Sequence, residues 1–242
     1  MRAYVRKILL NRRLRALDIK IAFDQKKLGK SAQLQIEEGA SIASASISFQ
    51  HLSVGASSYI RSGCEILSIS KIGRFCSIGN GVILGLERHG HPLDWVSTHP
   101  FQHDADGRNF VHPARPARLD HDVWVGREAI IMEGVTIGTG AVIGARTIVT
   151  QDVPPYAIFA GTPGRVIRFR HPPEIIVGLL ASRWWNLPRN YLSHAPMDKP
   201  ADFLLHLNQR PPEAQAQAHY SGLRITRDHM MPLTTEKIPE TA

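Results

Sequence analysis

The stretch VWVGREAIIMEGVTIGTGAVIGARTIV, residues 123–149, decides the fold, because its aliphatic residues return at every sixth position. The same step of six covers residues 36–84 and, after an interruption, residues 119–149. Fourteen of the fifteen positions in this register are aliphatic, and Ser48 is the exception. The fourteen are Ile36, Ile42, Val54, Ile60, Ile66, Ile72, Ile78, Leu84, Leu119, Val125, Ile131, Ile137, Ile143 and Val149.

A period of six matches neither an α-helix, with its period of 3.6, nor an alternating strand, with its period of 2. Glycine often follows the aliphatic residue, and a compact residue stands four places after it. The pattern predicts an all-β solenoid in which each hexad is a short strand and a turn, with the aliphatic side chain pointing inward. Cys64 and Cys76 share the compact position, which predicts small core residues rather than reactive thiols.

The net charge of +8 belongs to one end of the chain. Residues 1–30 carry ten Lys and Arg against two Asp, and the other 212 residues balance at 19 against 19. This distribution predicts no nucleic-acid groove on the body. Tyr4, Val5, Ile8 and Leu9 stand at helical spacing, so residues 1–30 are expected to be helical. Such a helix either caps the fold with its charged face in solvent or contacts a membrane surface or an acidic partner weakly.

The compartment expected from the sequence is the cytoplasm. The chain has no run of 18 apolar residues, and its first residues lack the apolar centre of a signal peptide. Two cysteines in a chain of this length do not suggest a disulfide scaffold.

Two segments carry a family resemblance. IGRFCSIGNGVILG (72–85) and the stretch that opens at residue 123 resemble the hexapeptide-repeat acyltransferases. HPLDWVSTHPF (91–101), followed by WWNLP (184–188), is most similar to the xenobiotic branch, which includes streptogramin and chloramphenicol acetyltransferases. HPLD also resembles a segment of maltose and galactoside acetyltransferases. The resemblance covers about residues 36–190 and implies a left-handed parallel β-helix, a homotrimer with active sites between subunits, and acetyl-CoA as acyl donor.

The hexads are interrupted over residues 86–118, and a loop of this length in a compact domain is usually functional. In the family such a loop reaches over the neighbouring subunit and carries the catalytic histidine, and the matching residue is His91. Transfer of an acetyl group to a hydroxyl needs a base that is free near neutral pH, which suits an imidazole.

A metal site is the alternative for this loop. His89, His91, His99 and His103 lie within 15 residues of each other, and His112 and His121 follow. The gamma-type carbonic anhydrases, a related β-helix class, hold zinc with three histidines across a subunit interface. None of the fourteen aliphatic positions is directly followed by His, so no metal is expected.

The resemblance also implies where the coenzyme lies. Arg127, Ala145, Thr150 and Gln151 match coenzyme contacts, although many relatives have lysine where Gln151 stands. The positions of Arg165 and Arg168 match phosphate contacts, and Trp124 matches a tryptophan beside the active site.

Some of these positions also have a plain structural interpretation. The coil would require Gly126 and Ala145 in any case, and Trp124 is equally compatible with packing on the outer face. Arg165 and Arg168 share a side if the chain turns helical there, and a solvated pair is the alternative.

The chain divides into four segments. Residues 1–30 form the basic segment and residues 31–170 the β-helix with its loop 86–118. Residues 171–210 form a helical cap that begins at Pro172 and Pro173 and is expected to cover the open end of the solenoid. Residues 211–242 are expected to be a tail.

The sequence thus predicts an acetyl-CoA-dependent O-acetyltransferase with His91 as general base. The expected acceptor is a sugar or polysaccharide precursor, and an antibiotic-like xenobiotic is the alternative. A metal-dependent β-helix enzyme and a scaffold without catalysis are less favoured. Retention of the HPLD segment and of both arginines counts against the scaffold.

Overall fold

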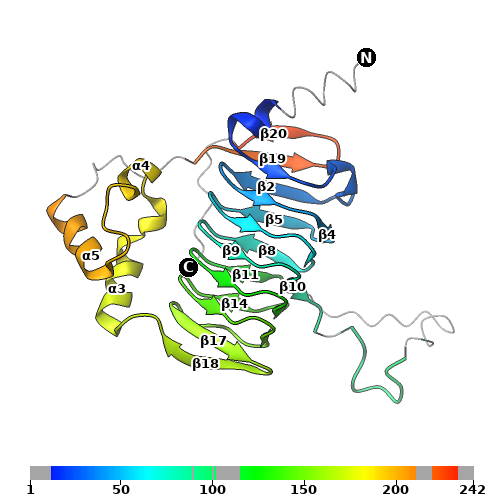
Figure 1. Cartoon of the computed structure of the whole chain (residues 1–242). Helices are drawn as coiled ribbons and strands as arrows, with labels where there is room; N and C mark the ends of the chain where they lie inside the picture. The colour runs from blue at the N-terminus through cyan, green and yellow to red at the C-terminus, as the bar shows by residue number, and fades with distance from the viewer. Residues whose placement is uncertain (1–11, 89, 100, 102–114, 211–219, 234–242) are drawn as a thin grey trace.

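Short strands stacked in three sheets form the body of the protein. The computed structural model describes residues 12–88, 90–99, 101, 115–210 and 220–233. Within these residues, the chain from residue 20 to residue 161 winds as a left-handed parallel β-helix (Figure 1). Between residues 41 and 149, successive strands belong to the eight-stranded, the five-stranded and the seven-stranded sheet in turn.

Parallel neighbours within a sheet come from successive coils. The eight-stranded sheet contains, in order, β1 (Lys20–Ile21), β3 (Ser41–Ile42), β6 (Tyr59–Ile60), β9 (Ser77–Ile78), β12 (Trp124–Val125), β15 (Val142–Ile143), β17 (Ala157–Gly161) and β18 (Gly164–Phe169). The five-stranded sheet contains β16 (Ile148–Val149), β13 (Ile130–Met132), β10 (Ile83–Leu86), β7 (Cys64–Ile66) and β4 (Ala45–Ile47). The seven-stranded sheet contains β14 (Thr136–Ile137), β11 (Ala117–Leu119), β8 (Ile69–Ile72), β5 (His51–Val54), β2 (Gln33–Glu37), β19 (Gly222–Thr226) and β20 (Met230–Pro232).

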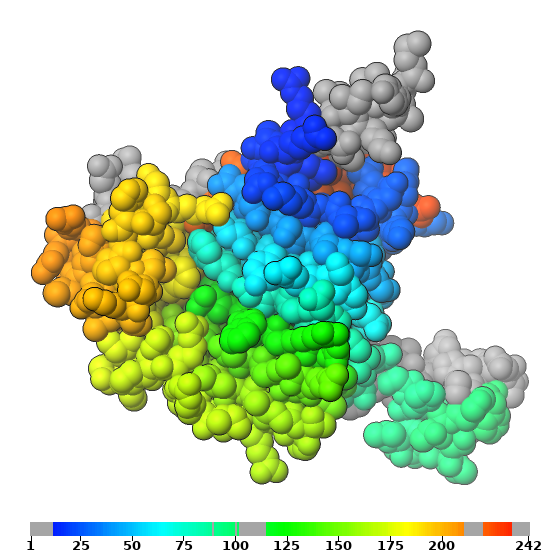
Figure 2. Space-filling view, in the orientation of Figure 1, coloured from blue at the N-terminus to red at the C-terminus, as the bar shows by residue number. Residues whose placement is uncertain are grey.

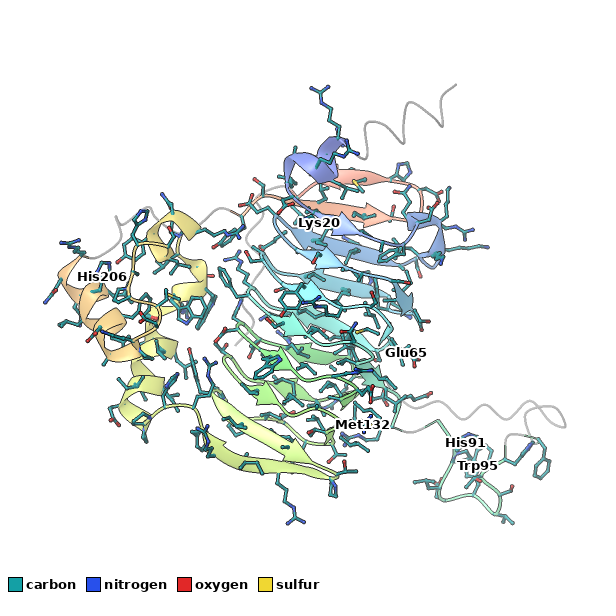
Figure 3. All side chains as sticks on the ribbon, in the orientation of Figure 1. Lys20, Glu65, His91, Trp95, Met132 and His206 are labelled. Atoms are coloured by element: carbon teal, nitrogen blue, oxygen red, sulfur yellow. The ribbon has the colours of Figure 1, made fainter. Side chains whose placement is uncertain are left out.

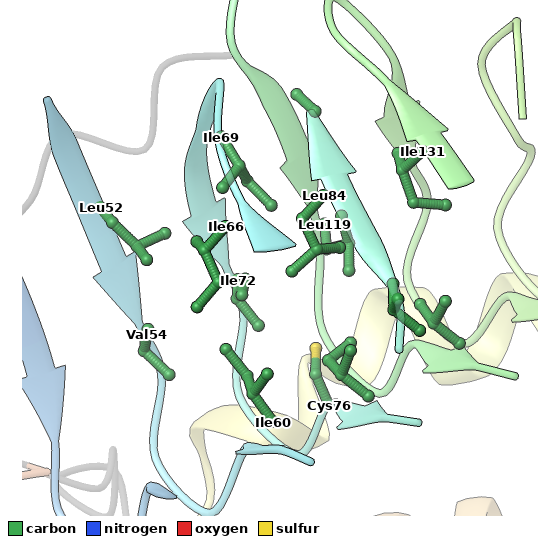
Figure 4. Packing of buried hydrophobic residues seen from close by; sticks show 14 of the residues in the cluster. Leu52, Val54, Ile60, Ile66, Ile69, Ile72, Cys76, Leu84, Leu119 and Ile131 are labelled. Atoms are coloured by element: carbon green, nitrogen blue, oxygen red, sulfur yellow. The ribbon is translucent and has the colours of Figure 1, made fainter. Parts of the chain in front are cut away.

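The hexad register forms the core of the coil, as predicted. All fourteen aliphatic positions are at most 2% exposed. Figure 4 shows Val54, Ile60, Ile66 and Ile72 pointing into the space that the three sheets enclose. Both cysteines are also buried, and burial raises the pKa of Cys64 and brings that of Cys76 to about 12, which confirms them as inert core residues.

The register slips at Ser48, the position that is not aliphatic. Ile47 pairs with Ile66 in the five-stranded sheet, and Ser48 is exposed. The prediction that residue 48 holds the inward position is therefore wrong by one residue. The coil reaches its inward side chain after five residues here, because Ile47 is apolar and Ser48 is not.

The C-terminal helices lie beside the coil and do not cover its end (Figure 1). These are α3 (Pro173–Ser182), the 3₁₀ helix η2 (Trp184–Asn186), α4 (Arg189–Leu192) and α5 (Pro200–Gln209). The expectation that they cover the open end is wrong. Phe75 and Tyr156 stand in the turns from the seven-stranded to the eight-stranded sheet and are part of one apolar cluster with Trp184 and Trp185. The aromatic side chains on these turns thus form an apolar surface on the flank of the coil, and the helices pack against it.

Antiparallel strands, rather than helices, pair with edge strands of two of the sheets. β18 pairs with β17 at the C-terminal edge of the eight-stranded sheet, and β19 pairs with β2 at the N-terminal edge of the seven-stranded sheet. Residues 222–232, which lie in the expected tail, form the β19–β20 hairpin.

The expected basic segment contributes to the coil as well. Residues 12–16 are helical, β1 joins β3 in parallel, and a 3₁₀ helix, η1 (Gln25–Lys27), follows. Residues 1–11 of this segment lie outside the described residues. No helix in the described ranges is long and apolar enough to cross a membrane.

A loop leaves the coil between β10 and β11, at the corner that joins the five-stranded to the seven-stranded sheet. Figures 1 and 2 show its described part projecting from the body, on a different side from the helices. The projecting loop and the terminal helices confirm the expected fold class.

Candidate active site

His91 lies on the projecting loop, with an exposed ring (Figure 3). Its Nδ1 is 2.8 Å from the carbonyl oxygen of Thr98. A carbonyl oxygen only accepts hydrogen bonds, so Nδ1 donates and the neutral ring keeps a lone pair on Nε2. Thr98 is therefore the orienting group that sequence analysis could not identify, since a backbone carbonyl has no signature in the sequence.

Of the neighbouring histidines, His99 lies within the described residues and has a partner of its own. His99 Nδ1 accepts a hydrogen bond from the backbone N–H of Phe101 at 3.1 Å, and the two rings pack together. His89, His103 and His112 lie outside the described residues. Among the residues that the structure describes, no group of three His, Cys, Asp or Glu side chains could hold a metal ion.

His121 belongs to the flank under the helices and not to the loop. Its ring stacks on Trp185, with centroids 4.8 Å apart and planes at 9°, and its Nδ1 accepts the backbone N–H of Arg74 at 3.0 Å. Burial lowers the pKa of His121 to about 3, and the charges of Lys71 and Arg74 add to the effect. The ring is thus a neutral packing group.

Trp124 is 57% exposed on the outer face of the eight-stranded sheet. It pairs with Val142, which pairs with Ile158, which in turn pairs with Arg168. Because paired residues of neighbouring strands point to the same face, these four side chains form one outer row. Three strand spacings of about 4.8 Å make the row about 14 Å long.

Arg165 and Arg168 lie on β18, and the suggestion that this segment is helical is wrong. On a regular strand, residues three apart point to opposite faces. Here Arg165 pairs with Ala160 and Arg168 with Ile158, and the register shifts between them, so Ile167 is an extra residue. This bulge brings both guanidinium groups to the same outer face.

Arg127 and Ala145 lie at the corner between the eight-stranded and the five-stranded sheet, in successive coils, and both are exposed. Arg127 donates to Glu128 at 2.8 Å, and Arg146 donates to the other oxygen of Glu128 at 2.7 Å. The hydrogen bonds from Arg146 and Arg127 lower the pKa of the Glu128 carboxyl. Sequence analysis missed this cluster, although Glu128 and Arg146 are three hexads apart and hence stacked.

Gly126, at the same corner, is required by the stacking of the coils. A Cβ at this position would lie 2.5 Å from the backbone nitrogen of Ala145. The structural interpretation therefore accounts for Gly126 without a ligand.

Thr150 and Gln151 lie at the other edge of the five-stranded sheet. They are exposed in the turn after β16, at the corner from which the His91 loop leaves two coils earlier. Within one chain, the predicted site residues thus lie on the eight-stranded sheet, at both corners of the five-stranded sheet and on the loop. The fold brings Trp124 into one row with Arg168 and stacks Arg127 near Ala145, but it leaves His91 out on the loop, away from the coils (Figure 3).

Two hollows in the described part of the chain lie elsewhere. The larger, about 560 Å³, is lined by residues 14–15, 19–22 and 41–43, and the other by residues 13, 16–17, 220–223 and 232–233. Neither includes His91 or a predicted coenzyme contact.

Comparisons with known proteins give consistent relatives. No family model matches the chain. It is 44% identical over 131 residues to a chloramphenicol acetyltransferase of Agrobacterium fabrum, which covers 51% of this chain and 63% of that protein. It is 38% identical over 122 residues to a probable macrolide acetyltransferase of Lysinibacillus sphaericus, covering 48% of this chain and 68% of that protein. The chain therefore spans a little under two thirds of the length of the chloramphenicol acetyltransferase.

Two solved structures are similar at a lower level. The polySia-specific acetyltransferase NeuO gives a TM-score of 0.44 with 28% identity, over 62% of this chain and 71% of that one. A hexapeptide-repeat acetyltransferase of Vibrio cholerae, solved with acetyl coenzyme A, gives a TM-score of 0.43 with 24% identity, over 55% of this chain and 72% of that one.

Proposed function

We propose that this chain, which belongs to the hexapeptide-repeat acetyltransferase family and to its branch of chloramphenicol and macrolide acetyltransferases, transfers an acetyl group from acetyl-CoA to a hydroxyl group, with His91 as general base. The observation that carries this proposal is the hydrogen bond from His91 Nδ1 to the Thr98 carbonyl. It leaves Nε2 as the nitrogen that can accept the proton of an acceptor hydroxyl.

The chemistry needs one proton to move twice. Acetyl-CoA supplies the acetyl group as a thioester. His91 Nε2 takes the proton as the acceptor oxygen forms its bond to the acetyl carbon, and the imidazolium then gives the proton to the departing sulfur. The Thr98 carbonyl stabilises the imidazolium and holds the ring in one orientation throughout.

The outer row from Trp124 to Arg168 suits an extended donor. Val142 and Ile158 between them are apolar and half-buried, and Arg165 joins Arg168 on the same face. An apolar surface with two cations at one end fits a flexible arm that ends in phosphates. Arg127, Ala145, Thr150 and Gln151 remain proposed contacts along the corners of the coil.

A homotrimer would complete the site. Ile83, Ile130 and Ile148 pair in one row on the outer face of the five-stranded sheet, between the two corners that carry the predicted residues. On the loop, Leu93 is 79% and Val96 105% exposed. Both apolar surfaces would be covered if the loop of one subunit lay against the coils of its neighbour.

The acceptor is proposed from the relatives' names. Chloramphenicol and macrolide acetyltransferases favour a hydroxyl of an antibiotic-like small molecule. A second candidate is a glycan near a membrane. It is supported by described residues 12–30, which carry seven Lys and Arg against two Asp and so have a net charge of +5.

The test is release of free thiol from acetyl-CoA by the purified protein, with chloramphenicol, macrolides, streptogramins and sugar oligomers offered separately. We expect turnover with one class only. Absence of both turnover and coenzyme A binding would refute the proposed activity and favour the scaffold without catalysis.

A further inference from the structure

The base of the His91 loop is fastened to the coil at defined points. β10 is irregular at Gly85, where its pairing with β13 shifts. Gly85 has φ +78, and a Cβ there would lie 2.0 Å from the carbonyl oxygen of Ser68. Only glycine fits this conformation and this close approach, and the bulge turns the chain out of the coil.

The turn at residues 133–134, in the next coil, holds both ends of the loop. The backbone N–H of Glu133 donates to the Leu86 carbonyl at 2.9 Å, and that of Gly134 donates to the Arg115 carbonyl at 2.6 Å. The carboxylate of Glu133, a residue only 6% exposed, accepts the backbone N–H of Arg88 at 3.0 Å. A hydrogen bond to a carboxylate in such a position is stronger than one between neutral groups.

The side chain of Arg88 reaches one coil further. Its Nη2 donates to the carbonyl oxygen of Thr150 at 2.6 Å. Thr150 and Gln151 are predicted coenzyme contacts, and Arg88 precedes His91 by only three residues. Arg88 therefore bonds to the turn of Glu133 through its backbone and to the turn of Thr150 and Gln151 through its side chain.

We propose that Arg88, held by Glu133, is a positioning residue that couples the His91 loop to the turn of Thr150 and Gln151. This inference rests on the proposed function. Fixing the loop at this base removes conformational freedom that His91 would otherwise lose when the reactants assemble. Because coupling is reciprocal, a donor that contacts the 150–151 turn also steadies the loop.

The experiment compares Arg88→Met with Arg88→Lys, and Glu133→Ala with Glu133→Gln. Arg88→Met removes the donor to Thr150, whereas lysine keeps one donor. Glu133→Gln keeps an acceptor oxygen for the Arg88 N–H, whereas alanine removes it. Arg227→Met, in the β19–β20 hairpin, is the matched control.

We expect Arg88→Met and Glu133→Ala to lower kcat by about 10- to 100-fold, the scale of a small misplacement of a catalytic group. The KM for acetyl-CoA should change by less than about threefold, and Arg88→Lys and Glu133→Gln should regain part of the loss. In hydrogen exchange without ligand, the peptide spanning residues 87–99 should exchange faster in Arg88→Met than in the parent.

The outcomes separate the two proposals. A parent protein without turnover or coenzyme binding contradicts the proposed function, while the exchange of the loop in the free protein still reports on Arg88. Unchanged kcat and unchanged loop exchange in Arg88→Met overturn the positioning role. A rise in donor KM alone also overturns it, because Arg88 would then act as a direct donor contact.

Discussion

Trp124 and Arg168 point outward from the same row of the eight-stranded sheet, with Val142 and Ile158 between them. The row owes its cationic end to the bulge at Ile167, since a regular strand would turn either Arg165 or Arg168 away. Its geometry predicts where the two ends of a bound donor lie: the nucleotide phosphates at β18 and the acetyl end toward Trp124.

The double change Arg165→Ala and Arg168→Ala should raise the KM for acetyl-CoA by about tenfold or more. Hydrogen bonds to charged groups contribute about 1.5–3 kcal/mol each, and exposure to solvent reduces this contribution. The KM for the acceptor should barely change. Rising salt should weaken donor binding in the parent and less so in the variant. The measurement is steady-state kinetics at two ionic strengths, with Arg118→Ala as control. A donor KM equal to that of the parent would show the pair to be ordinary surface charge.

His91→Ala should lower kcat by about 10²- to 10⁴-fold, the usual contribution of general-base assistance. The affinity for acetyl-CoA, measured by calorimetry, should stay near that of the parent, because the ring is proposed to act on the acceptor hydroxyl. His99→Ala is the matched control, and its effect should be far smaller.

A chelator tests the metal alternative for the same loop. Turnover should be the same with and without it, since no metal is proposed. If chelation abolishes turnover and zinc restores it, the assignment of His91 as base is wrong and the loop is a metal site.

The sequence predicted the coil because the buried positions and the backbone geometry both repeat with the same period of six residues. A residue such as Ile137 points inward in any coil with this period, so its buried position follows from its place in the six-residue register. The slip at Ser48 could not be foreseen from the period, because it depends on Ile47 facing Ile66.

The features that sequence analysis missed depend on contacts between distant segments or on backbone atoms. The helices lie on the flank because Phe75 and Tyr156 offer an apolar surface at two turns that are far apart in the chain. The group that orients His91 is the backbone carbonyl of Thr98. Every residue has a backbone carbonyl, so this contact has no signal in the sequence. The Glu128–Arg146 pair, in contrast, follows from the 18-residue length of one coil.

His121 should make the protein less stable as the pH falls. Its pKa is about 3 in the folded protein and about 6.5 in the unfolded chain, so between these values only the unfolded chain takes up the proton. Above pH 6.5 both states are neutral and the residue contributes no pH dependence. At pH 4.5 the loss should be about 2 kcal/mol relative to pH 7. Urea unfolding at both pH values should show a smaller loss in His121→Gln, and an equal loss would place the pH dependence in other groups.

Ile130→Glu should dissociate the proposed trimer without unfolding the chain. Ile130 is the middle residue of the row on the five-stranded sheet, and its side chain points away from the core that its neighbour Ile131 fills. A carboxylate there would be buried unpaired three times in the assembly, which costs several kcal/mol. Light scattering should give a parent mass of three chains of 26.9 kDa, about 81 kDa, and a variant mass near that of one chain. Arg118→Glu, on the outer face of the seven-stranded sheet, is the matched control and should remain trimeric. A parent that is monomeric refutes the trimer, and an Ile130→Glu protein of parent mass shows that the subunits meet through another surface.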